Sequence, residues 1–423
     1  MAVITPYFSH SDVGITNNTA VRYFPLGFGG DDGENFSTSD ENRAVTLISE
    51  TATIGGFIVK LTVAPGVGRS WTFTIRKNRT NTALSVTISG TDTTAANWAD
   101  RVIFSAGDEL SVESSPSGTP LLTQDFHSQI LMSSSNYIIM GGTGDLTNGQ
   151  WDGGLVARHP NLQGIVGDGP FGGTTEGNVC PVGGTLKNFY LKIGTAPGSG
   201  NTRTFTLRLN GSVQFTFSLT DSTTTANDTA TLVTVAAGDL LLYRTTGQQA
   251  GTEATFAAWA CSFTSDSPLL GAPFFHGDTS PNTSSDTFYP LYGSGESASE
   301  SEVLNTAFGS VQLSNLYVKF ETAPGSGNTF TTTVYTQSSP TALSVAVNGG
   351  SDTSGNNTTN TVTANQDDSI SVNLSPDSSP ASSAYYSFSL LMKWTGRAFP
   401  GFTDAFFDFY EQHGGNDLKL CHS

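Results

Sequence analysis

The sequence predicts an all-β protein made of three tandem antiparallel β-sandwich (jelly-roll-like) domains followed by a short C-terminal tail. Three observations predict this class. The 423-residue chain contains 47 Gly and 27 Phe, and only 13% of its residues are charged, a composition that favours strands over helices. One turn motif returns three times at a domain-sized period. The segments that flank each copy alternate apolar and polar residues with the period of two that is typical of strands.

The repeated motif is Ala-Pro-Gly-x-Gly, with its prolines at Pro65, Pro197 and Pro324. The copies lie about 130 residues apart, which is the size of a domain and not of a solenoid unit. Pro presets φ for the second position of a β-turn, and Gly accepts the positive φ of the third. We therefore interpret the motif as a chain reversal between two core strands. A lysine precedes each turn, and we expect these side chains to cover a sheet edge rather than to bind a ligand; they are Lys60, Lys192 and Lys319.

Each repeat shows the same succession of strands and turns. An apolar strand leads into the Pro-Gly turn, two alternating strands follow it, and a polar loop then leads to a short strand. A Gly-Asp turn, or Asp-Asp in the third copy, precedes a further alternating strand, and an aromatic-rich strand closes the unit. The closing strands are expected at 126–132, 256–263 and 385–394. Aromatic strands punctuated by Pro and Gly are expected to open the units, at 23–28 in the first, at 137–140 or alternatively 159–162 in the second, and at 288–293 in the third.

These elements amount to seven or eight short strands per unit, with turn signals every 8–12 residues, as in a sandwich or jelly roll. The predicted divisions are a first domain at 1–134, a second at 135–270, a third at 271–394 and a tail at 395–423.

Composition argues against several classes of function. The formal net charge is −18, so the chain repels nucleic-acid phosphates. The first 14 residues have no positively charged and apolar pattern, so we expect no secretory signal, and no apolar stretch is long enough to predict a membrane span. The cysteines are too few for a disulfide framework, so buried free thiols are expected; they are Cys180, Cys261 and Cys421.

A search for catalytic motifs predicts no enzyme and no bound cofactor. There is no serine elbow, phosphate loop or zinc helix. The stretch 167–172 matches Gly-x-Gly-x-x-Gly but contains a Pro and precedes no predicted helix. The six histidines are scattered, and no metal site is predicted from them. Calcium remains a minor alternative at the acidic loops 31–34 and 367–368, although neither has the spacing of a calcium-binding loop.

The tail differs from the repeats because it concentrates aromatic side chains that are too apolar to remain in water. Two interpretations stay open: the aromatic residues pack on the third domain, or they form an arm that docks on a neighbouring subunit. The partner-docking candidates are Phe402, Phe406, Phe407, Phe409 and Tyr410.

The repeated signature of strand, Ala-Pro-Gly-Ser-Gly-Asn-Thr, Thr-Phe-Thr-Leu-Arg and Ala-Ala-Gly-Asp-Leu resembles modules in structural proteins of tailed bacteriophages. These are the jelly-roll modules of capsid decoration proteins, head fibres and tail spikes. The resemblance covers most of 55–132, 183–263 and 309–394. The third copy departs from it, because it has lost the Phe and the Arg of the strand after the turn.

The resemblance implies a non-enzymatic virion protein, assembled in the host cytoplasm and exposed on the particle, that forms a homo-oligomer, in particular a trimer about a shared axis. Capsid or tail proteins are the implied partners. We expect three domains strung outward from the particle and anchored either by 1–21 or by the aromatic tail. The alternatives are a host-recognition or carbohydrate-binding adhesin that contacts host-surface glycans and, third, a polysaccharide-degrading tail spike.

Overall fold

The fold is taken from a computed structural model of the chain. It describes residues 3–11, 18–26, 39–122, 126–143, 163–165, 177–247, 256–267, 271–278, 281–291, 296–377, 379–383 and 385–396. Within these residues the regular elements are strands, apart from two 3-10 turns, η1 (Glu41–Ala44) and η2 (Glu300–Glu302). The predicted all-β class is confirmed.

The first domain is a jelly roll of two antiparallel sheets. The inner sheet has the strand order β1-β9-β4-β7, and the outer sheet has the order β2-β8-β5-β6, with the short β3 also paired to β8. This order arises when a long hairpin folds over on itself into two Greek keys. The strands are β1 (Val3–Ser11), β2 (Arg22–Phe24), β3 (Thr46–Leu47), β4 (Ala52–Leu61), β5 (Gly66–Lys77), β6 (Thr80–Gly90), β7 (Thr94–Phe104), β8 (Glu109–Ser117) and β9 (Phe126–Ser134).

The second domain repeats this plan with one additional strand, and its described residues include no counterpart of β2. Its inner sheet has the order β11-β10-β19-β13-β16, with β17 on β13, and its outer sheet has the order β12-β18-β14-β15. The additional strand, β11, pairs in parallel with β10. The strands are β10 (Tyr137–Thr143), β11 (Gly164–Ile165), β12 (Asn178–Val179), β13 (Gly184–Ile193), β14 (Gly198–Leu209), β15 (Ser212–Asp221), β16 (Thr225–Asp228), β17 (Val233–Val235), β18 (Leu240–Gly247) and β19 (Ala257–Ser265).

The third domain has the topology of the first. Its sheets have the orders β20-β28-β23-β26 and β21-β27-β24-β25, with β22 paired to β27. The strands are β20 (Ala272–Asp278), β21 (Thr287–Tyr289), β22 (Asn305–Thr306), β23 (Val311–Phe320), β24 (Gly325–Thr336), β25 (Ser339–Gly349), β26 (Ser354–Ala364), β27 (Ser369–Asp377) and β28 (Tyr386–Trp394).

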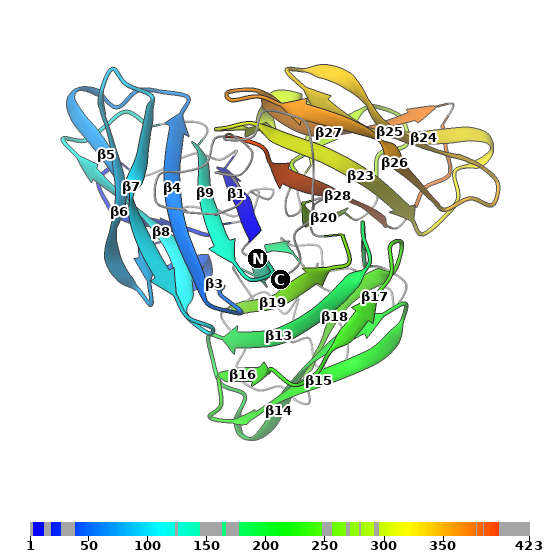
Figure 1. Cartoon of the computed structure of the whole chain (residues 1–423), viewed down its shortest axis with the longest axis horizontal. Coiled ribbons are helices and arrows are strands. Elements are labelled where there is room, and N and C mark those ends of the chain that lie inside the picture. Colours follow the sequence, from blue (N-terminus) through cyan, green and yellow to red (C-terminus); the bar gives the residue numbers. More distant parts are fainter. Residues whose placement is uncertain are drawn as a thin grey trace, which may run out of the picture.

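The three jelly rolls lie side by side around a common centre (Figure 1). Strand β3 of the first domain contacts β19 of the second, β12 of the second contacts β28 of the third, and β22 of the third contacts β1 of the first. The expectation of domains strung in a line is therefore wrong. The equivalent short strand of each domain contacts the inner sheet of another, and this head-to-tail contact closes after three steps.

Two local expectations need correction. The polar loop expected before Val102 and Val362 is instead part of the long strands β7 and β26, which pair with β4 and β23. The polar residues of these strands are exposed or half-buried. The N-terminal segment forms a strand of the first domain over Val3–Ser11, where β1 pairs along its whole length with β9, and its role as an anchor stays a prediction. Strand β10 corresponds to β1 and β20 and not to the aromatic strands β2 and β21, as its pairing with the closing strand β19 shows.

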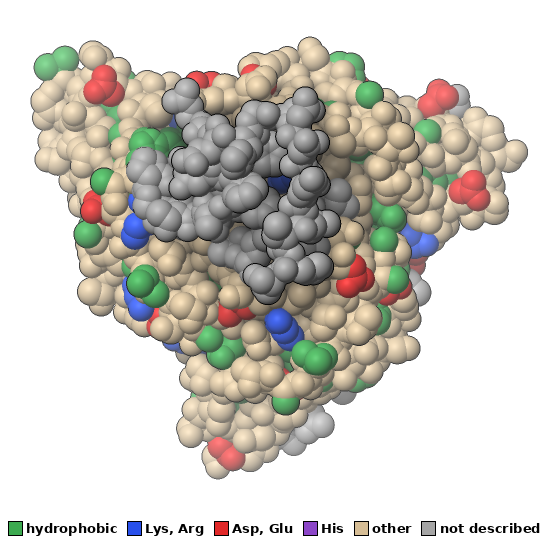
Figure 2. Space-filling model, viewed as in Figure 1, with side chains coloured by type: hydrophobic (Ala, Val, Ile, Leu, Met, Phe, Trp, Pro, Cys, Tyr) green, Lys and Arg blue, Asp and Glu red, His purple; other side chains and the backbone are tan. Residues whose placement is uncertain are grey.

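The described surface in Figure 2 consists mostly of backbone and small polar side chains, with charged and hydrophobic side chains in small separate groups. Among the described residues no helix has the length and hydropathy needed to cross a membrane. Most of the buried apolar residues lie in one cluster that includes side chains from all three domains, and a small second cluster joins Leu47 of the first domain to Ala258 and Ala260 of the second. The domains thus share a core and are not joined by linkers alone.

Candidate functional site: the joints of the ring

The most regular feature of the ring is a backbone clasp that occurs once in each domain. Ile48 donates to the Asp108 carbonyl at 3.0 Å and accepts from Gly107 at 2.7 Å. Cys180 makes the same pair of bonds in the second domain, with Asp239 and Gly238, at 2.7 Å each. In the third domain Ala307 bonds to Asp368 and Asp367 at 2.9 and 2.6 Å. The clasp fixes the short strands that contact the neighbouring domain.

An acidic side chain holds each of these turns. Asp239 accepts from the Ala236 amide and from the Asn210 side chain, both at 2.7 Å. Asp108 has equivalent bonds from Ser105 and Asn78, at 2.6 and 2.7 Å. Burial alone would raise the pKa of Asp108, but these hydrogen bonds and the Lys77 ammonium lower it overall.

The third turn contains the acidic pair Asp367 and Asp368, for which the sequence analysis kept calcium binding as an alternative. Asp368 accepts from Gln337 Nε2 at 2.5 Å and from the Asn365 amide at 2.8 Å. Asp367 stands at φ 68°, the conformation that Gly107 and Gly238 adopt in the other repeats, and Asp tolerates that conformation better than most residues. Both residues therefore have a structural role in the turn. No group of three or more His, Cys, Asp or Glu in the described part of the chain is arranged to hold a metal, and the other acidic loop, 31–34, lies outside it.

Replacing the turn carboxylate tests this role. We expect Asp239→Ala to lower the free energy of unfolding by about 1–2 kcal/mol, because two hydrogen bonds to a charged acceptor are lost. Urea unfolding followed by fluorescence measures the change, with the exposed Asp352→Ala as the matched control. An Asp239 variant as stable as that control would contradict the assigned role.

Polar contacts join the first and second domains next to the chain connection between them. The Oγ atoms of Ser49 and Ser262 are 2.8 Å apart and buried. The Glu50 carboxylate accepts from both the backbone and the side-chain nitrogen of Asn136 at 2.6 Å, and Asn136 in turn accepts from Thr264 at 2.6 Å. These bonds position the connection between β9 and β10.

The outer part of the same joint is ionic. Lys192 of β13 forms an ion pair with Glu109 of β8, and Glu109 also accepts from Arg79 at 2.9 Å. Burial lowers the pKa of Lys192, and the nearby Arg79 charge lowers it further. The expectation that the repeated lysines only cover edges is thus too general. Lys192 bridges two domains, whereas Lys319 bonds to Thr353 within its own domain at 2.7 Å.

The other two joints use different hydrogen bonds. Between the second and third domains, the Val179 amide donates to Ser387 Oγ at 3.3 Å and Asn315 donates to the Pro181 carbonyl at 3.4 Å. Between the third and first domains, the Phe308 amide donates to Gln129 Oε1 at 3.1 Å. The contact between a short strand and the inner sheet of the neighbouring domain recurs at each joint, whereas the residues that form the hydrogen bonds differ.

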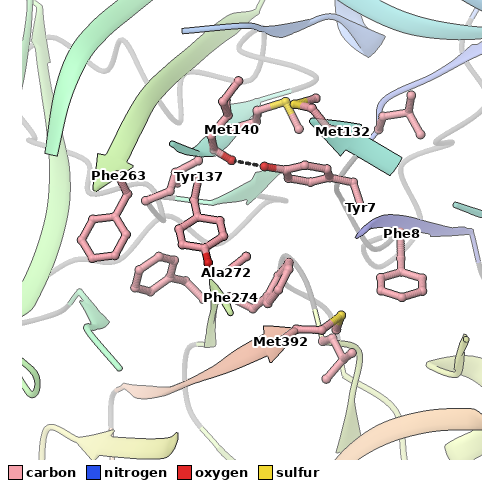
Figure 3. Packing of buried hydrophobic residues seen from close by; sticks show 14 of the residues in the cluster. Tyr7, Phe8, Met132, Tyr137, Met140, Phe263, Ala272, Phe274 and Met392 are labelled. Carbon is pink, nitrogen blue, oxygen red and sulfur yellow. Dashed lines mark hydrogen bonds between the residues drawn. The ribbon is translucent and has the colours of Figure 1, made fainter. Parts of the chain in front are cut away.

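The centre of the ring is apolar and lies between the first strands of the three domains, β1, β10 and β20. Figure 3 shows Tyr7, Tyr137 and Phe274 converging there, one from each domain. The Tyr7 hydroxyl donates to the Ile138 carbonyl at 2.5 Å, across a domain boundary. Burial raises the pKa of Tyr7 above its usual range, so the hydroxyl keeps the proton that this bond requires.

Two histidines are buried near the joints. His276 of β20 is fully buried and stacks on Phe388, with ring centroids 4.7 Å apart. Neither of its ring nitrogens has a hydrogen-bond partner among the described residues, and burial lowers its pKa to about 3. Burial and the nearby Lys60 lower the pKa of His127 to about 4, although a hydrogen bond to the Leu304 backbone of the third domain opposes them.

The remaining predicted site residues are distributed as follows. Cys180 and Cys261 are buried free thiols, as expected, and burial raises their pKa values. All five aromatic docking candidates of the tail, the stretch 167–172 and Cys421 lie outside the described residues.

The sequence analysis missed the joint residues. Gln129, Ser262 and Ser387 are buried polar residues in the closing strands, where apolar residues were expected. A polar residue within an otherwise apolar strand is the signal that could have found them.

Comparison with known proteins adds little. No model of a known protein family matches the chain, and no curated protein matches it. Two solved structures of PNGF-II align with 51% and 59% of this chain, at 8% and 9% identity and a TM-score of 0.20 each. The matched parts span 57% and 65% of the PNGF-II chains. Dimeric latent PorU from Porphyromonas gingivalis aligns with 88% of this chain and 31% of its own, at 10% identity and a TM-score of 0.18. Similarities at this level carry no argument about fold or function.

Proposed function

We propose that this chain is a non-enzymatic structural component of a bacteriophage particle, of the capsid decoration, fibre or spike type. The observation that carries the proposal is the closed ring of three jelly rolls. Polar side chains of the joints hydrogen-bond across the domain boundaries, as Ser49, Gln129 and Glu50 illustrate. A rigid body of this kind suits a load-bearing or spacing role. The sequence resemblance to modules of tailed-phage proteins supports placing that role on a phage particle.

The proposal places the protein on the particle surface after assembly in the host cytoplasm, with capsid or tail proteins as partners. One chain already contains three jelly rolls around a centre. A homo-oligomer, trimer included, would therefore use surfaces other than the joints that the domains share within the chain.

The proposal is tested on purified phage particles from producing cultures. Mass spectrometry should detect peptides of this chain in a fixed ratio to the major capsid protein, and antibodies against it should label intact particles in electron micrographs. Recovery of the chain only from the particle-free fraction would contradict the proposal.

Binding of the purified chain to specific glycans on an array would favour the adhesin alternative. Release of reducing sugar from host polysaccharide would favour the tail-spike enzyme.

A further inference from the structure

One end of the first domain exposes apolar side chains that its counterparts lack. Val67, at the start of β5, is 86% exposed, and Leu121 and Leu122 are 47% and 48% exposed. The Leu121 amide donates to the Pro65 carbonyl at 2.9 Å, so the two segments lie side by side. The exposed Arg69 completes the group. We call these four residues the first tip.

The side chains of Arg69 and Leu121 both approach Gly66, the residue before Val67. A methyl group placed on Gly66 would lie 3.5 Å from Arg69 Cδ and 3.8 Å from Leu121 Cδ1. A cation and a leucine thus border the same turn that presents Val67. The result is a small apolar surface with one positive charge, on a protein that carries 36 acidic and only 18 basic residues.

The fold does not require these residues. In the third domain the Ala381 amide donates to the Pro324 carbonyl at 2.7 Å, which is the same backbone bond. There the positions of Val67, Arg69, Leu121 and Leu122 are taken by Ser326, Asn328, Ala381 and Ser382. In the second domain, Ser199 and Asn201 take the first two positions. The same backbone thus carries polar or small residues at the equivalent positions of the other domains. Apolar side chains that are exposed although the fold does not require them are typical of an interaction surface.

We propose that the first tip binds the aromatic C-terminal segment of a second copy of this chain. The segment 397–423 interleaves aromatic residues with the acids Asp404, Asp408 and Glu411. Aromatic rings bury a large apolar area at an interface, and carboxylates complement the guanidinium of Arg69. The complementarity is therefore both apolar and electrostatic. Strand β28 ends at Trp394, opposite Val311, which is the end of the third domain away from its own Pro324 turn.

This contact joins two different surfaces, so it is heterologous and adds copies head to tail. It rests on the self-assembly part of the proposed function but does not depend on a phage particle, because it is measured on the purified full-length chain. If the purified chain does not associate through the first tip, the proposed presence of the protein on phage particles is unaffected. If the protein is absent from particles, the proposed contact between copies is unaffected.

The test is sedimentation velocity of the full-length chain over a concentration series. We expect concentration-dependent association that the combined Val67→Ser, Leu121→Ala and Leu122→Ser variant weakens on the order of tenfold or more. The tail variant Phe406→Ser with Phe407→Ser, which removes apolar side chains from the other partner of the contact, should weaken the association equally. The matched control is Val213→Ser, which removes a 58% exposed apolar side chain from the second domain and should change nothing.

A charge exchange makes the test specific. Arg69→Glu should weaken association, and adding Asp404→Lys and Asp408→Lys should restore it. A monomer at every concentration would overturn the proposal. Association that the tip variant leaves unchanged would also overturn it, as would docking of the segment on its own copy, seen as tip-dependent protection from proteolysis at all concentrations.

Discussion

Replacement of Phe274 by Ala should lower the free energy of unfolding by about 3–5 kcal/mol, the range for truncating a buried aromatic side chain. Phe274 is buried at the centre of the ring, next to side chains of the other two domains (Figure 3). Because the three domains share one core, the loss should destabilise all of them and not the third alone.

Each domain carries its own buried tryptophan, namely Trp71, Trp259 and Trp394, so the prediction can be resolved by domain. Variants that keep one of these three and replace the other four tryptophans of the chain by Phe would report each domain separately in urea unfolding. The three reporters should shift together in the Phe274→Ala background, whereas Phe274→Leu should shift them far less. A shift confined to Trp394 would show that the domains unfold independently.

The second large effect is a loss of stability in acid. The folded-state pKa of His276, about 3, lies below its ordinary value of 6.5. The unfolded chain therefore binds the proton more readily between these two values. The contribution of the neutral, buried histidine is fully present above pH 6.5 and is lost as the pH falls toward 3, by about 1.4 kcal/mol per pH unit.

His127 adds a second contribution of the same sign, with its lower limit near pH 4. Urea unfolding at about pH 7 and about pH 4.5 measures the combined slope. The His276→Phe variant keeps an aromatic ring that can stack on Phe388. We expect it to reduce the dependence of the unfolding free energy on pH by the contribution of His276, leaving that of His127. A slope identical to that of the unaltered chain would mean that His276 is protonated in the folded state.

The turns were predictable because their residues are dictated by backbone geometry. Pro65, Pro197 and Pro324 lie buried at the turns they predicted, and the acidic turns around Asp108 and Asp239 recur as expected. The closing strands were predictable from their continuous apolar character, since β9, β19 and β28 are central in their sheets.

The first strands were harder to predict because their burial comes from other domains. β1 and β20 contain Pro6 and Pro273, which argue against a strand in sequence-based reasoning. Both strands lie at the edge of their sheets, where a missing N–H is tolerated. Their apolar residues have partners only once the ring has closed.

The ring itself has no local signature. A repeat period gives the number of domains and not their arrangement, and equivalent joint positions hold residues as different as Ile48, Cys180 and Ala307. Long polar edge strands such as β26 are also predicted as loops. The sequence of β26 consists mostly of Asn and Thr, so it lacks the alternation of apolar and polar residues by which a strand is recognised.

The closed ring is tested most directly by small-angle X-ray scattering on the dilute, chromatographically monomeric chain. A compact body of 423 residues should have a radius of gyration of about 22 Å, and the scattering curve calculated from the ring should fit the data. A clearly larger radius of gyration, with a distance distribution extended along one axis as for three domains in a line, would contradict it.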